Sequence, residues 1–259
     1  GRDMARSGEE RRKRILDLVR SGGRQEVQEI ATALGVAVET VRRDLRVLED
    51  RHLLQRVHGA AMPVESGSFE TAMDHRAQTR LAEKRRIAAA AVEAIGDAQT
   101  IFLDEGYTPM LIAEAIAELT QPLTVVTASL ANAVAIGKAP HHSVLLLGGR
   151  VRSRTLATVD HWATAMLAQL NLDLAILGAN GITVESGLTT PDPAVAEVKR
   201  TAVAVSRRRI FIGIHTKFGV TSFCTFARVQ DFELLITEEA LPLRQAQRFA
   251  ALGLHVERV

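Results

Sequence analysis

The chain has 259 residues, of which 47% are hydrophobic and 24% are charged, and its formal net charge is +2 at pH 7. This balance is typical of globular proteins with a sizeable core, and it excludes disordered and collagen-like chains. A single cysteine, a polar N-terminus and the lack of a long apolar run exclude an internal disulfide, a cysteine-based zinc site and a membrane helix, so we expect a cytoplasmic protein.

Positive charge is concentrated in the first 58 residues, which carry 13 Lys and Arg against 10 Asp and Glu, whereas the remainder is nearly neutral. A basic segment attached to a neutral body is typical of proteins that bind a polyanion. The run Arg11–Arg14 by itself more often marks a solvated helix face. The local pattern of the segment therefore has to decide between the two interpretations.

Three short amphipathic helices are predicted within this basic segment. The first spans about residues 11–20, and the second places apolar residues at three- and four-residue spacing from Val27 to Leu34 before it ends at Gly35. The third spans Val38–Asp50. Two compact helices joined by a tight turn form the helix-turn-helix layout, in which the second helix enters the major groove of DNA.

The third helix is the predicted recognition helix, because its arginines avoid the apolar stripe and can bind guanine edges or phosphates. Residues 53–57 alternate like a short strand that stops at His58-Gly59, which predicts a wing beside the helix. The candidate DNA-binding residues are Glu39, Thr40, Arg42, Arg43, Arg46, Arg56 and His58.

Residues 60–80 show little periodicity and contain Pro63, which predicts a linker between two domains. We therefore expect a winged helix-turn-helix domain at 4–59 and a second domain, for effector binding and oligomerisation, at 81–259. The helix that begins at about Leu81 either covers a sheet or pairs with another subunit.

From residue 99 onward, short apolar runs alternate with helical segments. Runs that are apolar on both faces and separated by helices predict a mainly parallel sheet in an α/β domain. In such sheets, ligands bind at the carboxyl ends of the strands. The predicted strands are 100–103, 123–127, 143–147, 172–177, 209–214 and 232–237, and the predicted helices include 108–119 and 129–138.

Glycine or polar residues follow four of these strands, at 104–109, 128–132, 178–181 and 215–219. A helix start offers free N–H groups to an anion, and Lys217 can neutralise one. Turns and helix caps explain any single loop as well. Because all four loops meet at one edge of the sheet, together they predict an anion-binding pocket.

The runs Val36–Leu45 and Arg56–Ala60 closely resemble the N-terminal signature of DeoR-type transcriptional regulators. That family usually has a serine where this chain has Ala37, so the resemblance implies a recognition helix that lacks a side-chain cap. It also implies that Asp44 orients one of the two arginines before it, since phosphates repel a carboxylate that faces DNA.

The strand-end loops resemble the C-terminal effector domain of the same family, which is similar in fold to sugar-phosphate isomerases. The resemblance implies a pocket for a phosphorylated sugar or polyol. Tyr107 and His215 depart from the family's usual residues and leave an unphosphorylated ligand open. The candidate effector-binding residues are Asp104, Glu105, Gly106, Tyr107, Thr108, Ser129, Arg152, Gly178, Asn180, Gly181, Lys199 and Lys217.

Three further features admit two interpretations each. Arg150, Arg152 and Arg154 form either a solvated loop or a strand edge that suits an anionic ligand or a subunit contact. Trp162, the single tryptophan, either packs in a core or an interface, which is the expectation, or serves as a platform for a sugar ring. Lys199 is expected at the surface, although the resemblance implies a lysine near the pocket here.

The sequence shows no pattern typical of catalysis. An isomerase of the related fold needs a carboxylate base on the turn that here reads Gly178-Ala179-Asn180-Gly181, which leaves only acids elsewhere, such as Asp104. We expect no catalytic residue, no metal and no cofactor. The predicted function is a repressor of carbohydrate catabolism genes, whose partners are a double-stranded DNA operator, a phosphorylated sugar or polyol, and further copies in a homodimer or homotetramer. The alternative is a sugar-phosphate isomerase-like enzyme with an accessory DNA-binding head.

Overall fold

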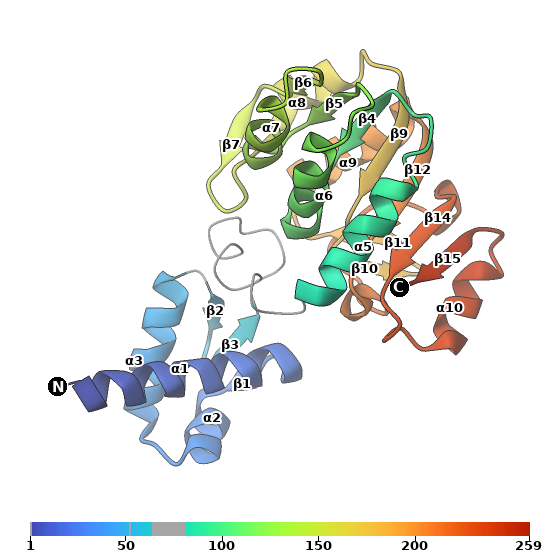
Figure 1. Ribbon diagram of the computed structural model, residues 1–259. Coiled ribbons are helices and arrows are strands. Elements are labelled where there is room, and N and C mark those ends of the chain that lie inside the picture. The colour runs from blue at the N-terminus through green and yellow to red at the C-terminus, as the bar shows by residue number, and fades with distance from the viewer. Residues whose placement is uncertain (1, 52, 64–80) are drawn as a thin grey trace. The chain divides into compact units, whose positions relative to one another are not determined.

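The computed structural model describes residues 2–51, 53–63 and 81–259 (Figure 1). The chain divides into two compact units, one up to residue 75 and one from residue 76, which we call the head and the body. Each unit has a hydrophobic core of its own and is described by itself. Among the helices in the described ranges, none is both long and apolar enough to cross a lipid bilayer.

In its described residues, the head contains three helices and a three-stranded antiparallel sheet with the strand order β1-β3-β2 (Figure 1). Its elements are α1 (Arg2–Gly22), β1 (Gln25–Glu26), α2 (Val27–Leu34), α3 (Val38–Asp50), β2 (Leu54–Val57) and β3 (Ala60–Pro63). The predicted second and third helices are confirmed, and Gly35 ends α2 in the left-handed conformation at φ 64°. Helix α1 begins well before residue 11, the predicted start. The sequence did not predict the earlier start because the first turns of α1 are polar and carry no periodic apolar signal.

Strand β3 corrects the expected start of the linker. Residues 60–63 form the central strand of the head's sheet instead of a connecting segment. Ala60 and Ala61 are small enough to be almost fully buried, at 1% and 0% exposed. The remainder of the expected linker, residues 64–80, lies outside the described residues.

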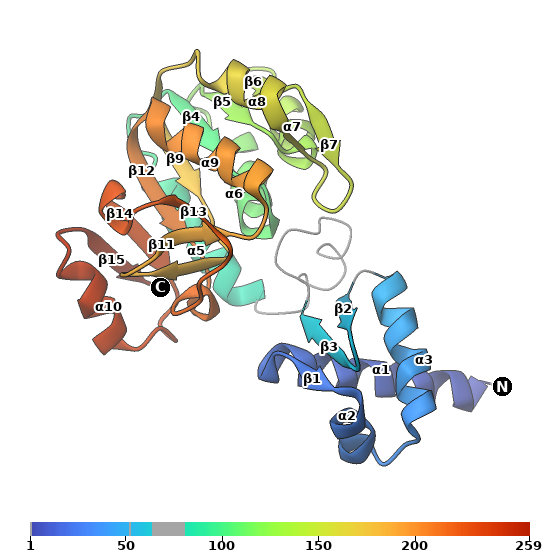
Figure 2. The same ribbon diagram turned by 180° about the vertical axis from the view of Figure 1, so that it is seen from behind.

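The body is built on a seven-stranded parallel sheet with the order β15-β14-β12-β9-β4-β5-β6 (Figure 2). All six predicted strands are present, and β15 is an additional edge strand. The strands are β4 (Thr100–Leu103), β5 (Thr124–Thr127), β6 (Ser143–Leu146), β9 (Leu172–Leu177), β12 (Ser206–Ile212), β14 (Leu234–Thr237) and β15 (His255–Arg258). The predicted α/β fold class is therefore confirmed.

Helices cover both faces of this sheet (Figures 1 and 2). The helices are α5 (Leu81–Glu93), α6 (Tyr107–Ala117), α7 (Leu130–Gly137), α8 (Asp160–Leu167), α9 (Pro193–Val205) and α10 (Leu243–Ala250). On one face, Ile87 of α5 packs in the same core as Ile101 and Leu103 of β4, while Phe102 between them points into the opposite core. Strand residues thus alternate between two buried faces. Helix α5 covers the sheet, which was one of the two roles expected for the helix that begins at about Leu81.

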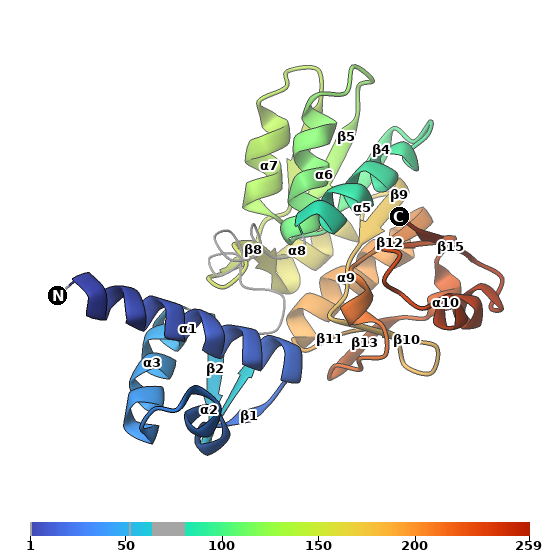
Figure 3. The ribbon, with the colours of Figure 1, turned by 60° about the horizontal axis from the view of Figure 1, so that its bottom comes forward.

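Two smaller antiparallel units also belong to the body (Figure 3). Of these, the sequence indicated only a strand edge at Arg150–Arg152, as one of two alternatives, and β7 is that strand. β7 (Arg150–Arg152) and β8 (Ala157–Val159) form a hairpin. β10 (Gly181–Thr183), β11 (Gly187–Thr190) and β13 (Cys224–Ala227) form a three-stranded sheet. Most of these strands have only three or four residues, which is too short to produce a clear alternation in the sequence.

Candidate functional site

The exposed face of α3 carries most of the residues expected to contact DNA. Glu39, Arg42, Arg43 and Arg46 are exposed, with Thr40 half-buried beside them. The Arg42 guanidinium lies 3.4 Å from the Glu39 carboxylate, and both side chains are more than half exposed. The opposite face of α3 is buried in the head's core, so the arginines point away from that core. Ala37 at the N-cap makes no side-chain hydrogen bond, as expected.

The predicted wing is the hairpin of β2 and β3, and it is tied to α3 through Arg56. The backbone N–H of Arg56 donates to Glu49 Oε2 at 2.6 Å, and its Nε donates to Glu49 Oε1 at 3.0 Å. His58 is exposed at the turn, where Gly59 takes a φ of 68°. The wing therefore offers His58 directly to solvent and holds Arg56 against α3.

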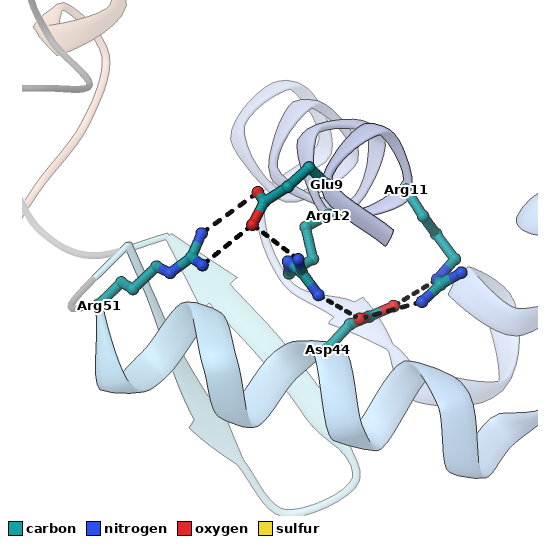
Figure 4. Close-up of polar contacts among 5 residues, drawn as sticks. All are labelled: Glu9, Arg11, Arg12, Asp44 and Arg51. Carbon is teal, nitrogen blue, oxygen red and sulfur yellow. Dashed lines mark hydrogen bonds and ion pairs between the residues drawn. The ribbon is translucent and has the colours of Figure 1, made fainter. Parts of the chain in front are cut away.

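A buried carboxylate on α3 fastens this helix to α1 (Figure 4). Asp44 is 2% exposed, and its Oδ2 accepts a hydrogen bond from Arg11 Nε at 2.5 Å while Oδ1 accepts one from Arg12 Nη1 at 3.2 Å. Asp44 thus binds two arginines of α1, whereas the prediction was that it binds one of the two arginines that precede it on α3. This corrects the expected role of Asp44 from an organiser of DNA contacts to a link between helices.

Glu9 extends the same contact between α1 and the end of α3 (Figure 4). Its carboxylate accepts hydrogen bonds from Arg12 Nη2 at 2.7 Å and from Arg51 Nη2 at 3.0 Å. These bonds, first from Arg51 and then from Arg12, lower the pKa of Glu9 to about 2. Half of the basic run at 11–14 therefore packs the head together, whereas Lys13 and Arg14 are exposed.

In the body, a small cleft that is partly open to solvent lies at the carboxyl ends of β4 and β5. Apolar residues of β4, β8 and α9 form much of its wall. Its polar lining consists of Asp104, Glu105, Thr155, Thr158 and Lys199. Three of the predicted effector residues, Asp104, Glu105 and Lys199, thus meet in one place, at the strand ends where the sheet topology predicts a ligand.

Lys199 and Asp104 form a buried ion pair at this cleft, with side chains 6% and 4% exposed. The Lys199 ammonium also donates to the carbonyl oxygen of Gly178 at 2.9 Å, and the backbone N–H of Gly178 donates to Asp104 Oδ2 at 2.9 Å. The N–H of Glu105 donates to the other carboxylate oxygen at 2.9 Å. Lys199 is therefore not at the surface, which corrects the expectation from its place on an amphipathic helix.

The loop after Asp104 leads directly into α6. Gly106 is the N-cap of α6 and has a φ of 128°, a conformation that side-chain-bearing residues rarely adopt. Tyr107 and Thr108 form the first turn and are half-buried. The ring of Tyr107 lies 5.4 Å from the ammonium of Lys84, which is 7% exposed. Lys84 was missed because it stands in a run of charged residues that reads as a solvated helix face.

Ser129 is the N-cap of α7. A helix cap was the alternative explanation for a hydroxyl residue in this loop. Its hydroxyl accepts a hydrogen bond from the backbone N–H of Asn132 at 3.2 Å, and Ser129 does not line the cleft. The side chain of Asn132 is buried and donates to the carbonyl oxygen of Asp104 at 2.8 Å. Asn132, which was not among the predicted residues, thus supports the loop that carries Asp104.

The turn at 178–181 has structural contacts of its own. The side-chain oxygen of Asn180 accepts a hydrogen bond from the Thr190 hydroxyl at 3.1 Å. At Gly181, an added Cβ would lie 2.1 Å from the carbonyl oxygen of Val220. Close backbone packing therefore requires this glycine, whether or not a ligand is bound.

Two further residues from the sequence analysis, Arg152 and Trp162, lie on β7 and α8. Arg152 lies with Nε 3.2 Å from a carboxylate oxygen of Asp192, the residue that caps α9. Trp162 is 76% exposed on α8, so it does not pack in a core of the described body. Packing in an interface, the other part of the expectation, and a role as a sugar platform both remain predictions.

A second polar group lies at the ends of β12 and β14. His215 Nδ1 is 2.5 Å from Glu238 Oε1, and the backbone N–H of His215 donates to the same oxygen at 3.0 Å. Lys217 closes the short helix η1 (His215–Lys217) and is half-buried. Only β9 separates β12 from β4, so Lys217 stands at the same sheet edge as Asp104, although it does not line the cleft.

Comparisons with known proteins agree with this architecture. Residues 11–66 match the family described as the DeoR-like helix-turn-helix domain, and residues 79–239 match the DeoR C terminal sensor domain. The HTH-type transcriptional regulator GlpR of Haloferax volcanii is 35% identical over 95% of this chain and 96% of that protein. The glycerol-3-phosphate regulon repressor of Escherichia coli is 30% identical over 90% of this chain and 92% of that protein.

Among solved structures, ribose 5-phosphate isomerase A from Methanocaldococcus jannaschii is similar over 54% of this chain and 55% of that chain, with 14% identity and a TM-score of 0.38. Both matched families and both named relatives belong to transcriptional regulation, which sets aside the alternative of an isomerase-like enzyme. The matches follow the order of head and body and extend over almost the entire chain. The chain therefore belongs to the DeoR family of helix-turn-helix transcriptional regulators.

Proposed function

We propose that this regulator represses genes of carbohydrate catabolism by binding an operator through its head, and that a small phosphorylated sugar or polyol bound by the body controls that binding. The observation that carries the proposal is the buried pair of Lys199 and Asp104 in a cleft at the strand ends. The relative from Escherichia coli is named as a repressor of the glycerol-3-phosphate regulon, which supports a phosphorylated polyol as the class of effector.

The head reads DNA through the exposed arginines of α3. Arg42, Arg43 and Arg46 project from a helix whose other face is held by the core and by Asp44, so the position of the helix is set before DNA binds. Arginine binds guanine through two hydrogen bonds and phosphate through charge. Exposed His58 on the wing contacts the neighbouring backbone or minor groove.

Effector recognition combines a charge with hydrogen-bonding groups. Asp104 accepts hydrogen bonds from ligand hydroxyls at the base of the cleft, where Thr155 and Thr158 add two hydroxyl groups. Lys217, at the same sheet edge, supplies positive charge for the phosphate. The small size of the cleft favours a small effector.

Control of DNA binding then follows from linkage. If the effector and the operator favour different arrangements of the chain, each changes the other's affinity by the same coupling free energy. The β7–β8 hairpin and α9 form walls of the cleft and are joined by the ion pair of Arg152 and Asp192. An effector bound in the cleft therefore contacts both the β7–β8 hairpin and α9, and can shift the two elements together.

The effector class is tested by thermal unfolding of the full chain with matched pairs of free and phosphorylated sugars and polyols. A ligand at 100 times its Kd stabilises the folded protein by about 2.7 kcal/mol. We expect a rise in Tm with phosphorylated members only, and we expect Lys217→Ala to abolish it while Lys138→Ala, an exposed lysine on α7, does not. Equal shifts with free sugars would contradict the phosphorylated class, and an unchanged shift in Lys217→Ala would contradict the proposed role of Lys217 in effector binding.

DNA reading by α3 is tested with Arg42→Ala on a site selected from random DNA by the wild-type protein. We expect a loss of about 1–3 kcal/mol in binding free energy and a relaxed preference at one base pair, measured by fluorescence anisotropy at fixed salt. Arg24→Ala is the control, because Arg24 is also exposed on the head but lies outside α3. A uniform loss on all sequences would assign Arg42 to a phosphate instead of a base.

A further inference from the structure

Two hydrogen bonds to one carboxylate join the end of α3 to the wing. Glu49 stands in the last turn of α3, and Arg56 is the third residue of β2. One oxygen of the Glu49 carboxylate accepts from the backbone N–H of Arg56 at 2.6 Å, and the other accepts from its Nε at 3.0 Å. The carboxylate therefore holds the backbone and the guanidinium of one residue at the same time. We call this contact the Glu49 clamp.

The sheet of the head places Arg56 where Glu49 can reach it. β2 is an edge strand, and its one partner among the described residues is β3, so the N–H of Arg56 bonds to Glu49 instead of to another strand. The side chain of Arg56 leaves the same face of β2 as that of Leu54, two residues earlier. Leu54 is 2% exposed and packs in the core that Leu48 of α3 also enters. Strand and core thus direct Arg56 at the end of α3.

The clamp leaves the outer end of the Arg56 guanidinium for a ligand. A guanidinium carries five N–H donors in a planar fork, and Glu49 binds only the one on Nε. Among the described residues, neither Nη group of Arg56 donates a hydrogen bond, and its side chain is 40% exposed. Paired N–H donors in a fixed plane match the oxygens of a phosphate.

Charge by itself argues against a carboxylate at this position. Partial burial raises the pKa of the Glu49 carboxyl, but the hydrogen bonds from Arg56 outweigh it and hold this pKa below its ordinary value. Glu49 is therefore ionised at neutral pH, and DNA phosphates repel an ionised carboxylate. Glu49 weakens DNA binding unless its effect on Arg56 outweighs that repulsion.

We propose that Glu49 is a positioning residue for DNA binding, which holds the Nη groups of Arg56 in the orientation that binds a phosphate beside the wing. The inference rests on the proposed function, because it requires that the head binds DNA through α3 and the wing. An arginine that is fixed before binding loses less side-chain entropy when it contacts DNA. Arg42 lacks such a clamp, since its pair with Glu39 is 3.4 Å long and both side chains are more than half exposed.

The sign of the effect of Glu49→Gln on DNA affinity tests the proposal. If only charge matters, removal of the acid tightens binding. If the clamp matters, binding weakens, because one amide oxygen cannot accept from both donors of Arg56. With the full-length protein and the selected DNA site, we expect fluorescence anisotropy to show a Kd raised about tenfold. We also expect the slope of log affinity against log salt to fall by about 0.9, the value of one phosphate contact.

Asp50→Asn is the matched control. It makes the same change from carboxylate to amide one residue further along, at an exposed position that is not part of the clamp. Charge alone acts there, so we expect the Kd to stay the same or to fall slightly. The salt slope should not decrease, because the control removes no phosphate contact.

The Arg56→Ala background separates positioning from folding. The backbone N–H at position 56 is still present in that background, whereas the guanidinium is absent. Glu49→Gln should then leave the Kd unchanged or lower it, since only the charge effect remains. A role of Glu49 in folding alone would weaken binding in both backgrounds. Thermal unfolding of each variant gives the temperature below which the head is folded, and affinities are compared there.

The outcomes distinguish this inference from the proposed function. Tighter or unchanged binding by the single variant Glu49→Gln, or an equal loss with and without Arg56, would overturn the positioning role and leave the proposed function standing. A wild-type chain that selects no site from random DNA would instead overturn the proposed function, and the positioning role with it.

Discussion

Replacing Lys199 with methionine is expected to destabilise the body by about 3–5 kcal/mol, because the change leaves a buried carboxylate without its counter-charge. Asp104 is 4% exposed on its side chain, and the bonds from the N–H groups of Gly178 and Glu105 do not neutralise it. Denaturant unfolding of the full chain, followed by circular dichroism, gives the free energy of unfolding. Lys138→Met, at an exposed lysine, should change it little.

A double-mutant cycle separates the ion pair from packing. Asp104→Asn removes the carboxylate charge at almost constant volume, so Asp104→Asn combined with Lys199→Met should cost less than the sum of the two single changes. Such a deficit measures the coupling of the pair. If Lys199→Met lowers the free energy of unfolding by less than about 1 kcal/mol, the Asp104 carboxylate does not need the Lys199 ammonium as its counter-charge. The ion pair would then no longer support a ligand site in the cleft.

In the head, Asp44→Ala is expected to lower the free energy of unfolding by about 3 kcal/mol, the lower end of the range for breaking a buried pair. The lower end applies because the side chains of Arg11 and Arg12 are 26% and 17% exposed, so water screens part of their charge once Asp44 is removed. Thermal unfolding of the full chain measures this loss. Asp50→Ala changes an exposed aspartate on the same helix and serves as the control.

The same substitution also tests whether the contact between α1 and α3 positions the DNA-reading helix. Asp44 is buried, so a purely local role predicts no loss of binding at temperatures where the head stays folded. We expect weaker binding to the selected site even there, since α3 loses its link to α1. Unchanged affinity in a folded Asp44→Ala protein would show that the core alone holds α3 in place.

Local patterns in the sequence were sufficient for most elements. The apolar spacing of α3 and the glycine after α2 predicted both helices at the observed residues, and the apolar runs predicted β4 and β9 without error. These elements were predictable because helix and strand periodicity act over a few residues. β3 was missed because Ala60 and Ala61 give no strand signal and become a strand only between β1 and β2.

The candidate site divides in the same way. The sheet topology predicted the edge at which the cleft lies, and the exposed arginines of α3 were recognisable from their spacing alone. Ser129 and Gly181, both predicted ligand residues, also have structural roles as a helix cap and a close backbone contact, and their binding of a ligand stays a prediction. A hydroxyl or glycine at a strand end has the same sequence signal in either role, and only its neighbours in space distinguish the two.

The sequence by itself determined the two-part organisation of this protein, its parallel sheet and the positive face of its recognition helix, because these depend on periodicity and composition along the chain. Tertiary structure alone decided which charges are buried and what they bind. Lys199 and Asp104 are 95 residues apart, and Arg11 and Asp44 are 33 apart. A charged residue on an amphipathic helix reads as solvated until the fold brings its counter-charge to it, and the free energy of that contact comes from burial, which no local pattern records.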